Sequence, residues 1–185
     1  MLSKAESILL WSSNLWMLGW GMLGPLFALF AQRVGGDVLE TTWVYAVYLV
    51  VTGVGIFVVG KVTDCVGQEW PLVVGYALNT VATFSYLLVS TVIGLFVVQI
   101  VQGVALALMT PTWYALYDKH SGDGSHDGYV WGLFSGMAFI VQGIALMLGG
   151  YIVTAYSFDV LFVVMGTILA ISTLWEARIL QYRVQ

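Results

Sequence analysis

Apolar residues occupy six long runs of this chain, and short polar segments separate them. A membrane-spanning helix needs about 20 mostly apolar residues, and six runs of that order can be drawn. They cover residues 7–31, 41–62, 71–90, 91–117, 128–151 and 158–175. The strict alternation of apolar and polar residues that is typical of membrane β-barrels is missing. The pattern predicts an all-α membrane protein with six transmembrane helices in one domain over residues 1–185.

The composition is typical of a protein embedded in a lipid bilayer. Hydrophobic residues make up 60% of the chain and charged residues only 9%, which excludes an ordinary soluble domain. The predicted third and fourth spans are separated only by the turn at Ser90 and Thr91. Because such short connections join antiparallel neighbours, we expect one packed bundle.

The distribution of lysine and arginine predicts the orientation of the bundle. Short loops rich in these residues stay in the cytoplasm. Five cations fall at the termini, the second loop or the fourth loop, namely Lys4, Lys61, Lys119, Arg178 and Arg183. Only Arg33 falls in an odd-numbered loop. We therefore expect an integral protein of the cell membrane with both termini in the cytoplasm.

Several functions are disfavoured by the same residues. The net charge is −4 and the cations are scattered, so a nucleic-acid partner is not expected. The fourth loop carries potential metal ligands, but their spacing matches no tight ligand pattern: Asp118, His120, Asp123, His126 and Asp127. No arrangement typical of a catalytic triad or a phosphate-binding loop is present. We predict no enzyme, no metal site and no cofactor.

A polar segment between the second and third spans contains Gly60, Asp64 and Gly67. Gly60 permits close helix approach or a sharp exit, Asp64 can accept backbone N–H groups at a following helix start, and Gly67 can adopt positive φ. Pro71 follows, as expected in the first turn of a helix. We interpret the segment as a cytoplasmic turn and as a conformational hinge.

The Gly-x-x-x-Asp-x-x-Gly spacing of this segment resembles the signature loop of the major facilitator superfamily. Two further matches follow in order: Gln102-Gly103 resembles the family's second motif, and Gly149-Gly150 with residues 158–162 resembles its entry into the sixth helix. The chain thus resembles one six-helix half of a transporter that normally has about twelve helices. The resemblance implies a three-plus-three bundle that divides at Ser90 and Thr91. Basic residues usual in the signature loop are replaced by Cys65, Gln68 and Glu69, so its charge relay is not expected.

Neutral polar residues are the candidates for contact with a solute. No carboxyl group or histidine falls near the centre of a predicted span, which argues against proton coupling through a mid-membrane carboxylate. A stripe at helical spacing in the fourth span carries Gln99, Gln102 and Trp113. The resemblance places the first and fourth helices at a central cavity, which adds Asn14; Gln142 lies on a similar stripe of the fifth span. Each amide could instead form a hydrogen bond to a neighbouring helix and only stabilise the bundle.

These observations predict a half-size secondary transporter or facilitator that moves a small solute by alternating access. Two halves of a full family member share one orientation in the membrane, and a parallel homodimer imposes the same relation. Spans two and five would then form the contact between copies. Two alternatives stay open: a non-transporting membrane scaffold or assembly partner, and a fragment or heteromeric half of a twelve-helix transporter.

Overall fold

The computed structural model describes residues 4–120 and 127–182, and these form helices joined by short turns. In chain order the helices are α1 (Lys4–Gly21), α2 (Leu26–Arg33), α3 (Val38–Val66), α4 (Glu69–Ser85), η1 (Tyr86–Leu88), α5 (Val92–His120), α6 (Asp127–Ala155), α7 (Phe158–Glu176) and η2 (Ala177–Tyr182). By length and composition, five helices of the described chain can cross a membrane, and α1 with α2 forms a bent sixth candidate. The predicted all-α fold is confirmed.

The first span differs from the single continuous helix expected over 7–31. It breaks between α1 and α2, whose axes are bent by 47°. Gly24 has φ of 24°, which side chains with a Cβ rarely adopt, and Pro25 has no backbone N–H to donate. Together they interrupt the hydrogen-bond ladder, so α2 leaves the direction of α1.

Local hydrogen bonds set both ends of α3. Asp37 accepts a bond of 2.7 Å from the backbone N–H of Glu40, and the Glu40 carboxylate accepts one of 3.0 Å from Asp37. This reciprocal capping box satisfies two donors that a helix start leaves free. At its other end the helix continues through the predicted hinge to Val66 and stops at Gly67, where φ is 88°.

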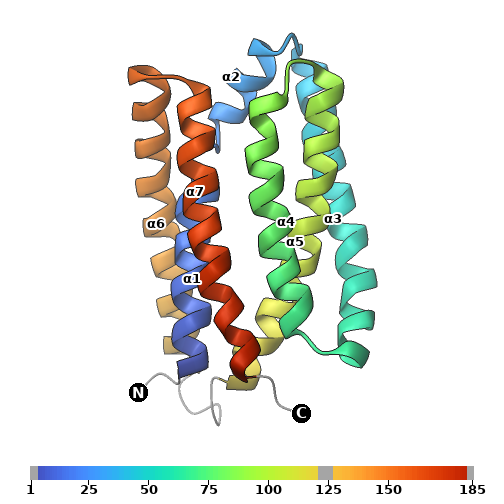
Figure 1. The fold of residues 1–185 in the computed structure, drawn as a ribbon, viewed down its shortest axis with the longest axis vertical. Helices are drawn as coiled ribbons and strands as arrows, with labels where there is room; N and C mark the ends of the chain where they lie inside the picture. Colours follow the sequence, from blue (N-terminus) through green and yellow to red (C-terminus); the bar gives the residue numbers. More distant parts are fainter. Residues whose placement is uncertain (1–3, 121–126, 183–185) are drawn as a thin grey trace.

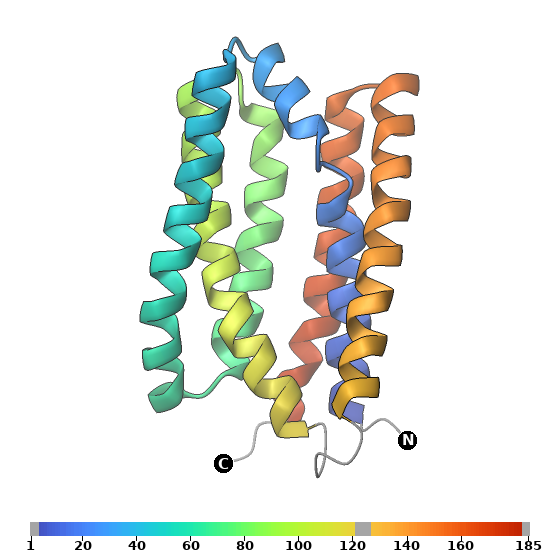
Figure 2. The same cartoon turned by 180° about the vertical axis from the view of Figure 1, so that it is seen from behind.

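The spans assemble into two groups of three helices that stand side by side (Figures 1 and 2). In the first group α1 packs against α6 and α7, and in the second α5 packs against α3 and α4. Contact between α4 and α7 joins the groups. Along the chain the spans divide into the first three and the last three. In space, however, the first span packs with the fifth and sixth, and the fourth span packs with the second and third. Each group therefore contains helices from both halves of the sequence.

The bundle has two ends that differ in structure. The α2 end comprises α2, the turn from η1 to α5 and the turn from α6 to α7; the Lys4 end comprises the start of α1, the turn from α3 to α4, and η2 (Figure 1). A buried apolar cluster lies toward each end: Phe30, Tyr86, Phe158 and Phe162 belong to the first, and Leu9, Tyr76, Trp113, Tyr117 and Ile179 to the second. Between them the hydroxyls of Thr80 on α4 and Thr173 on α7 lie 2.9 Å apart.

Glycines allow the closest helix contacts within each group. A Cβ added to Gly149 of α6 would lie 2.1 Å from the carbonyl oxygen of Met22, just before the break after α1. A Cβ added to Gly103 of α5 would lie 2.9 Å from the carbonyl oxygen of Tyr48 on α3. Small residues at these points let the backbones touch, as is usual in membrane bundles.

Candidate solute-binding cavity

A cavity of about 460 Å³ opens between the two helix groups toward the α2 end. Helices of both groups contribute to its wall, with α1, α2, α6 and α7 on one side and α3, η1 and α5 on the other. Its lining residues are Trp20, Leu23, Gly24, Pro25, Phe27, Ala28, Thr41, Thr42, Tyr45, Tyr48, Tyr86, Gln99, Gln102, Gln142 and Met165. Its volume is within the range of sites for small organic molecules.

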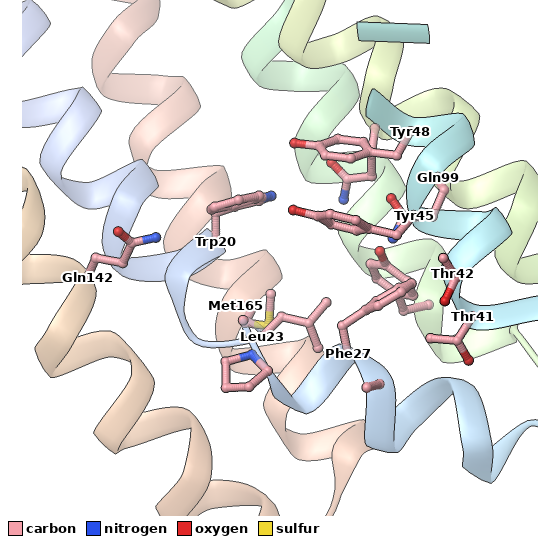
Figure 3. Close-up of a pocket in the computed structure, with 15 residues that line it drawn as sticks. Trp20, Leu23, Phe27, Thr41, Thr42, Tyr45, Tyr48, Gln99, Gln142 and Met165 are labelled. Carbon is pink, nitrogen blue, oxygen red and sulfur yellow. The ribbon is translucent and has the colours of Figure 1, made fainter. Parts of the chain in front are cut away.

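The wall combines aromatic faces with neutral hydrogen-bonding groups. Trp20 of α1 and Tyr45 of α3 point toward each other across the cavity, and Tyr48 lies one turn from Tyr45 (Figure 3). Gln99 lies on the α5 side and Gln142 on the α6 side (Figure 3). No residue of this lining carries a charged side chain. The cavity therefore offers stacking surfaces, amides and hydroxyls to a solute, and no fixed ion.

Hydrogen bonds between helices fix the inner wall of the cavity. The Asn79 amide of α4 donates to Oε1 of Gln102, and Nε2 of Gln102 donates to the Thr83 hydroxyl at 3.2 Å. Oδ1 of Asn79 accepts a bond of 2.9 Å from Nε1 of Trp16 on α1. Asn79 thus connects the two helix groups. These bonds leave one N–H of the Gln102 amide without a partner in the network, and that N–H can meet a solute.

A second cavity, of about 170 Å³, lies toward the Lys4 end. Its lining residues are Ser13, Trp16, Met17, Tyr76, Leu106, Met109, Thr110, Trp113, Tyr114 and Phe134. Trp16 of this smaller cavity stacks on Trp20 of the larger one, with ring centres 5.5 Å apart. The tryptophan pair and the Asn79 bond stand between the two cavities.

Aromatic side chains pack the Lys4 end beside the smaller cavity. Trp113 of α5 stacks on Phe134 of α6 with ring centres 4.4 Å apart, and on Tyr117 at 4.8 Å. Its indole Nε1 donates to the carbonyl oxygen of Leu9 on α1 at 3.4 Å. Trp113 therefore contacts both helix groups and draws them together at this end.

Comparison with known proteins agrees with this architecture. The family model described as Major Facilitator Superfamily matches residues 9–181. The chain belongs to the major facilitator superfamily. An uncharacterised MFS-type transporter of Methanocaldococcus jannaschii is 29% identical over 150 residues, which are 81% of this chain and 39% of that relative. The chain thus spans about two fifths of the length of the relative it matches. That relative is named as a transporter of this superfamily.

The structure of this superfamily member brings together three of the five predicted solute contacts. Gln99, Gln102 and Gln142 line the larger cavity, although they come from different helix groups. Trp113 lines the smaller cavity instead. Asn14 is among the lining residues of neither; its Nδ2 donates to the carbonyl oxygen of Leu10 at 2.7 Å, and its Oδ1 is buried without a partner in the described chain.

Further lining residues had a sequence signal that the prediction did not use. Thr41, Tyr45 and Tyr48 recur at steps of four and three, which places them on one stripe of α3. Trp16 and Trp20 are likewise four residues apart on α1. The prediction followed the first, fourth and fifth spans, whereas the second span also contributes an aromatic wall.

The signature loop is shorter than the sequence analysis expects. Gly60 and Asp64 lie within α3, and no atom lies within 4 Å of a Cβ built on Gly60, so this glycine makes no close helix contact. Of the three predicted hinge residues only Gly67 takes a positive φ, and the next helix begins at Glu69. The turn thus reduces to Gly67 and Gln68. A conformational role for the three hinge residues stays a prediction.

Parts of the charge pattern lie outside the described residues. This applies to Asp123 and His126 of the fourth loop and to Arg183 near the C-terminus. Within residues 4–120 and 127–182, no group of three or more histidine, cysteine, aspartate or glutamate side chains is arranged to hold a metal ion.

Proposed function

We propose that this chain is one half of a secondary transporter that moves a small, uncharged polar solute by alternating access. The observation that carries the proposal is the larger cavity, in which three glutamine amides from both helix groups meet the faces of Trp20 and Tyr45. Burying an ion in a neutral cavity is costly unless a counter-charge compensates it. A neutral solute with hydroxyl or amide groups fits this wall without that cost.

The direction in which the cavity opens follows from the expected orientation. Lys4, Lys61, Lys119 and Arg178 all belong to the Lys4 end or the connections there, which we assign to the cytoplasm. The larger cavity lies toward the α2 end and would receive solute from outside the cell. Alternating access then requires the α2 end to close and the Lys4 end to open.

We further propose that a second copy of the chain supplies the other half. The outer faces of α3 and α6 carry large exposed apolar side chains, including Phe57 at 77%, Phe139 at 76% and Met147 at 77%. Lipid can cover such faces, but a parallel two-fold dimer would also bring α3 and α6 of the two copies together. The length of the relative from Methanocaldococcus jannaschii supports a need for a second half. It equally favours the alternative that this sequence is part of a longer transporter.

A solute screen tests the transport proposal. Purified protein in lipid nanodiscs is melted with neutral sugars and polyols, neutral amino acids, carboxylates or quaternary ammonium ions. A solute that binds only the folded state at about one hundred times its Kd stabilises it by about 2.7 kcal/mol. We expect stabilisation by neutral polar solutes and their uptake into proteoliposomes. Stabilisation by carboxylates alone would contradict the proposal, and binding without uptake would favour a scaffold.

The site is then tested with matched glutamine variants. Gln99→Ala removes a lining amide, which should weaken solute binding about fivefold to tenfold, equivalent to about 1–1.5 kcal/mol. Gln32→Ala removes an exposed glutamine of α2 outside the lining and serves as the control. Equal affinity of both variants would remove Gln99 from the binding site.

Cysteine cross-linking tests the homodimer. After Cys65→Ser, a single cysteine at Phe57 or Phe139 should cross-link two copies in the membrane. Leu174→Cys, on α7 and 73% exposed, is the control that should not cross-link. A monomer mass in several detergents and in lipid, with no cross-link from α3 or α6, would contradict the dimer and leave the longer-transporter alternative.

A further inference from the structure

Glu176 is a fully buried carboxyl group that the cavity does not use. It is the last residue of α7, and its exposed fraction is 0%. Its Oε2 atom is in hydrogen-bond contact with the Ser12 hydroxyl of α1, and its Oε1 atom is buried without a partner among the described residues. An ionised carboxylate in such a place would lose its hydration without a cation to replace it, which strongly disfavours the charged form. The sequence analysis left this residue beyond the last span.

Hydrogen-bond counting at Ser12 indicates the protonation state of this carboxyl. The Ser12 Oγ atom lies 2.7 Å from the carbonyl oxygen of Ile8 and 3.1 Å from that of Leu9, in addition to its contact with Glu176. A serine hydroxyl has one proton to donate. With an ionised Glu176, three acceptor oxygens would share that proton. A carboxylic acid resolves the conflict, because Glu176 donates to Ser12 and Ser12 donates to Ile8.

The carboxyl lies where the two helix groups meet. Tyr76 of α4, in the opposite group, interacts with both Ser12 and Glu176. Tyr76 also lines the smaller cavity. Ser172 of α7 donates to the carbonyl oxygen of Ser12 at 2.8 Å. Three helices, α1, α4 and α7, therefore converge on one acidic group next to a cavity.

Other titratable groups lie on the elements that pack around Glu176, among them Glu69, the first residue of α4. Glu6 of α1 interacts with Tyr117 of α5. The guanidinium of Arg178, from η2, lies 4.1 Å from the ring centre of Trp175. Tyr86 of η1 belongs to the apolar cluster toward the α2 end, and on α6 the only carboxyl is that of its first residue, Asp127. Within the described chain, Tyr76 is the titratable group that faces Glu176.

We propose that Glu176 is the proton-binding site that couples solute movement to a proton. In its neutral form it donates to Ser12 and holds α1, α4 and α7 together at the Lys4 end. Glu176 takes up its proton from water on the α2 side while that end is open. On deprotonation the O–H bond breaks, the proton passes to water that enters the smaller cavity from the Lys4 side, and the remaining carboxylate is drawn to that water. The Lys4 end then opens. The coupling part of this proposal rests on the proposed transport function, whereas the proton site itself does not.

Infrared difference spectroscopy of the purified protein in lipid tests the site directly. Raising the pH from neutral to alkaline should remove a C=O stretching band of a buried carboxylic acid in the wild type. Glu176→Gln should lack the band, yet should fold as well as the wild type, because its amide can donate to Ser12 as the acid does. Glu40→Gln, at an exposed capping box, is the control that keeps the band. No such band at neutral pH, or an unchanged band in Glu176→Gln, would overturn the proposal.

Ser12→Ala keeps the test decisive if Glu176→Gln fails to fold. This change removes the acceptor of the carboxylic proton, so the band should shift in frequency. A band at its original position would overturn the assignment to Glu176.

Proteoliposomes separate the proton site from transport. An inward proton gradient should drive accumulation of the solute by the wild type. Glu176→Gln cannot deprotonate and so keeps the Lys4 end closed; it should lose this accumulation together with solute exchange, while still binding solute from the α2 end. Gradient-driven accumulation by Glu176→Gln would overturn the coupling. A band sensitive to Glu176→Gln in a protein that transports no solute would instead refute the proposed function and leave the proton site standing.

Discussion

The same two helix groups are separated at one end of this bundle and packed together at the other. Toward the α2 end the groups stand apart around a cavity of about 460 Å³, and the first span is broken there. Toward the Lys4 end they are drawn together by the Trp113 stack, and the cavity shrinks to about 170 Å³. Neutral amides face the open space at the α2 end, whereas the buried carboxyl of Glu176 lies toward the Lys4 end. In the proposed transporter, solute would bind at the α2 end and the Lys4 end would form the closed gate.

The contact of Gly149 with the break after α1 should be the most sensitive point of the α2 end. Gly149→Ala puts a methyl group 2.1 Å from the carbonyl oxygen of Met22. Because a backbone atom cannot swing away, we expect a loss of about 3 kcal/mol, at the upper end of overpacking costs. The melting temperature and folded yield measure this loss. Gly143→Ala, on the same helix with no atom within 4 Å of the added Cβ, should melt like the wild type.

Equal melting of the two glycine variants would mean that α1 and α6 approach less closely than the structure shows. The open shape of the α2 end would then need another cause, since this contact ties the broken span to α6.

Asn79 should have the next largest effect, because its side chain stands between the two ends. Asn79→Ala leaves the Gln102 carbonyl oxygen and the Trp16 indole without their partners. Unsatisfied buried groups cost about 1–3 kcal/mol, although such bonds average only about 0.6 kcal/mol in one membrane protein. We expect a lower melting temperature together with weaker solute binding, because Gln102 loses its fixed position.

Thr42→Ala provides the comparison for Asn79. Its hydroxyl lies in the larger cavity but donates within its own helix, to the carbonyl oxygen of Val38 at 2.7 Å. Its loss should leave the melting temperature unchanged. If Asn79→Ala behaves in the same way, the bond between the helix groups contributes nothing to the separation of the ends.

Much of the open end was predictable from the sequence, and the reasons are local. Span length and turn residues predicted six helices, and helical spacing brought Gln99 and Gln102 to one face. The break of the first span was harder to foresee, since Pro111 lies inside α5 without ending it. Pro25 differs in following Gly24, whose positive φ removes the helical path. Proline alone was therefore an insufficient signal.

The closed end depends on partners that are distant in the sequence. From the sequence alone, Glu176 is the polar residue at which the last span ends. Only its packing against Ser12 in the structure makes it a buried group. The exchange of the first and fourth spans between the helix groups likewise arises from side-chain fit across the bundle. Periodicity within one helix carries no information about which neighbour a face will meet.

Trp113 should have the smallest effect on solute binding, and it decides between two roles for one residue. The sequence predicts it as a solute contact, whereas its position predicts that it closes the Lys4 end. Trp113→Leu removes stacking on Phe134 and Tyr117, and each such aromatic pair is worth about 0.5–1.5 kcal/mol. In a Cys65→Ser background, a cysteine at Thr110 in the smaller cavity should react faster with a water-soluble thiol reagent after this change. A cysteine at Thr41, in the larger cavity, should react at its original rate, and solute affinity should stay the same. Weaker solute binding with unchanged labelling at position 110 would instead mean that Trp113 contacts the solute. It would also mean that Trp113 does not close the Lys4 end.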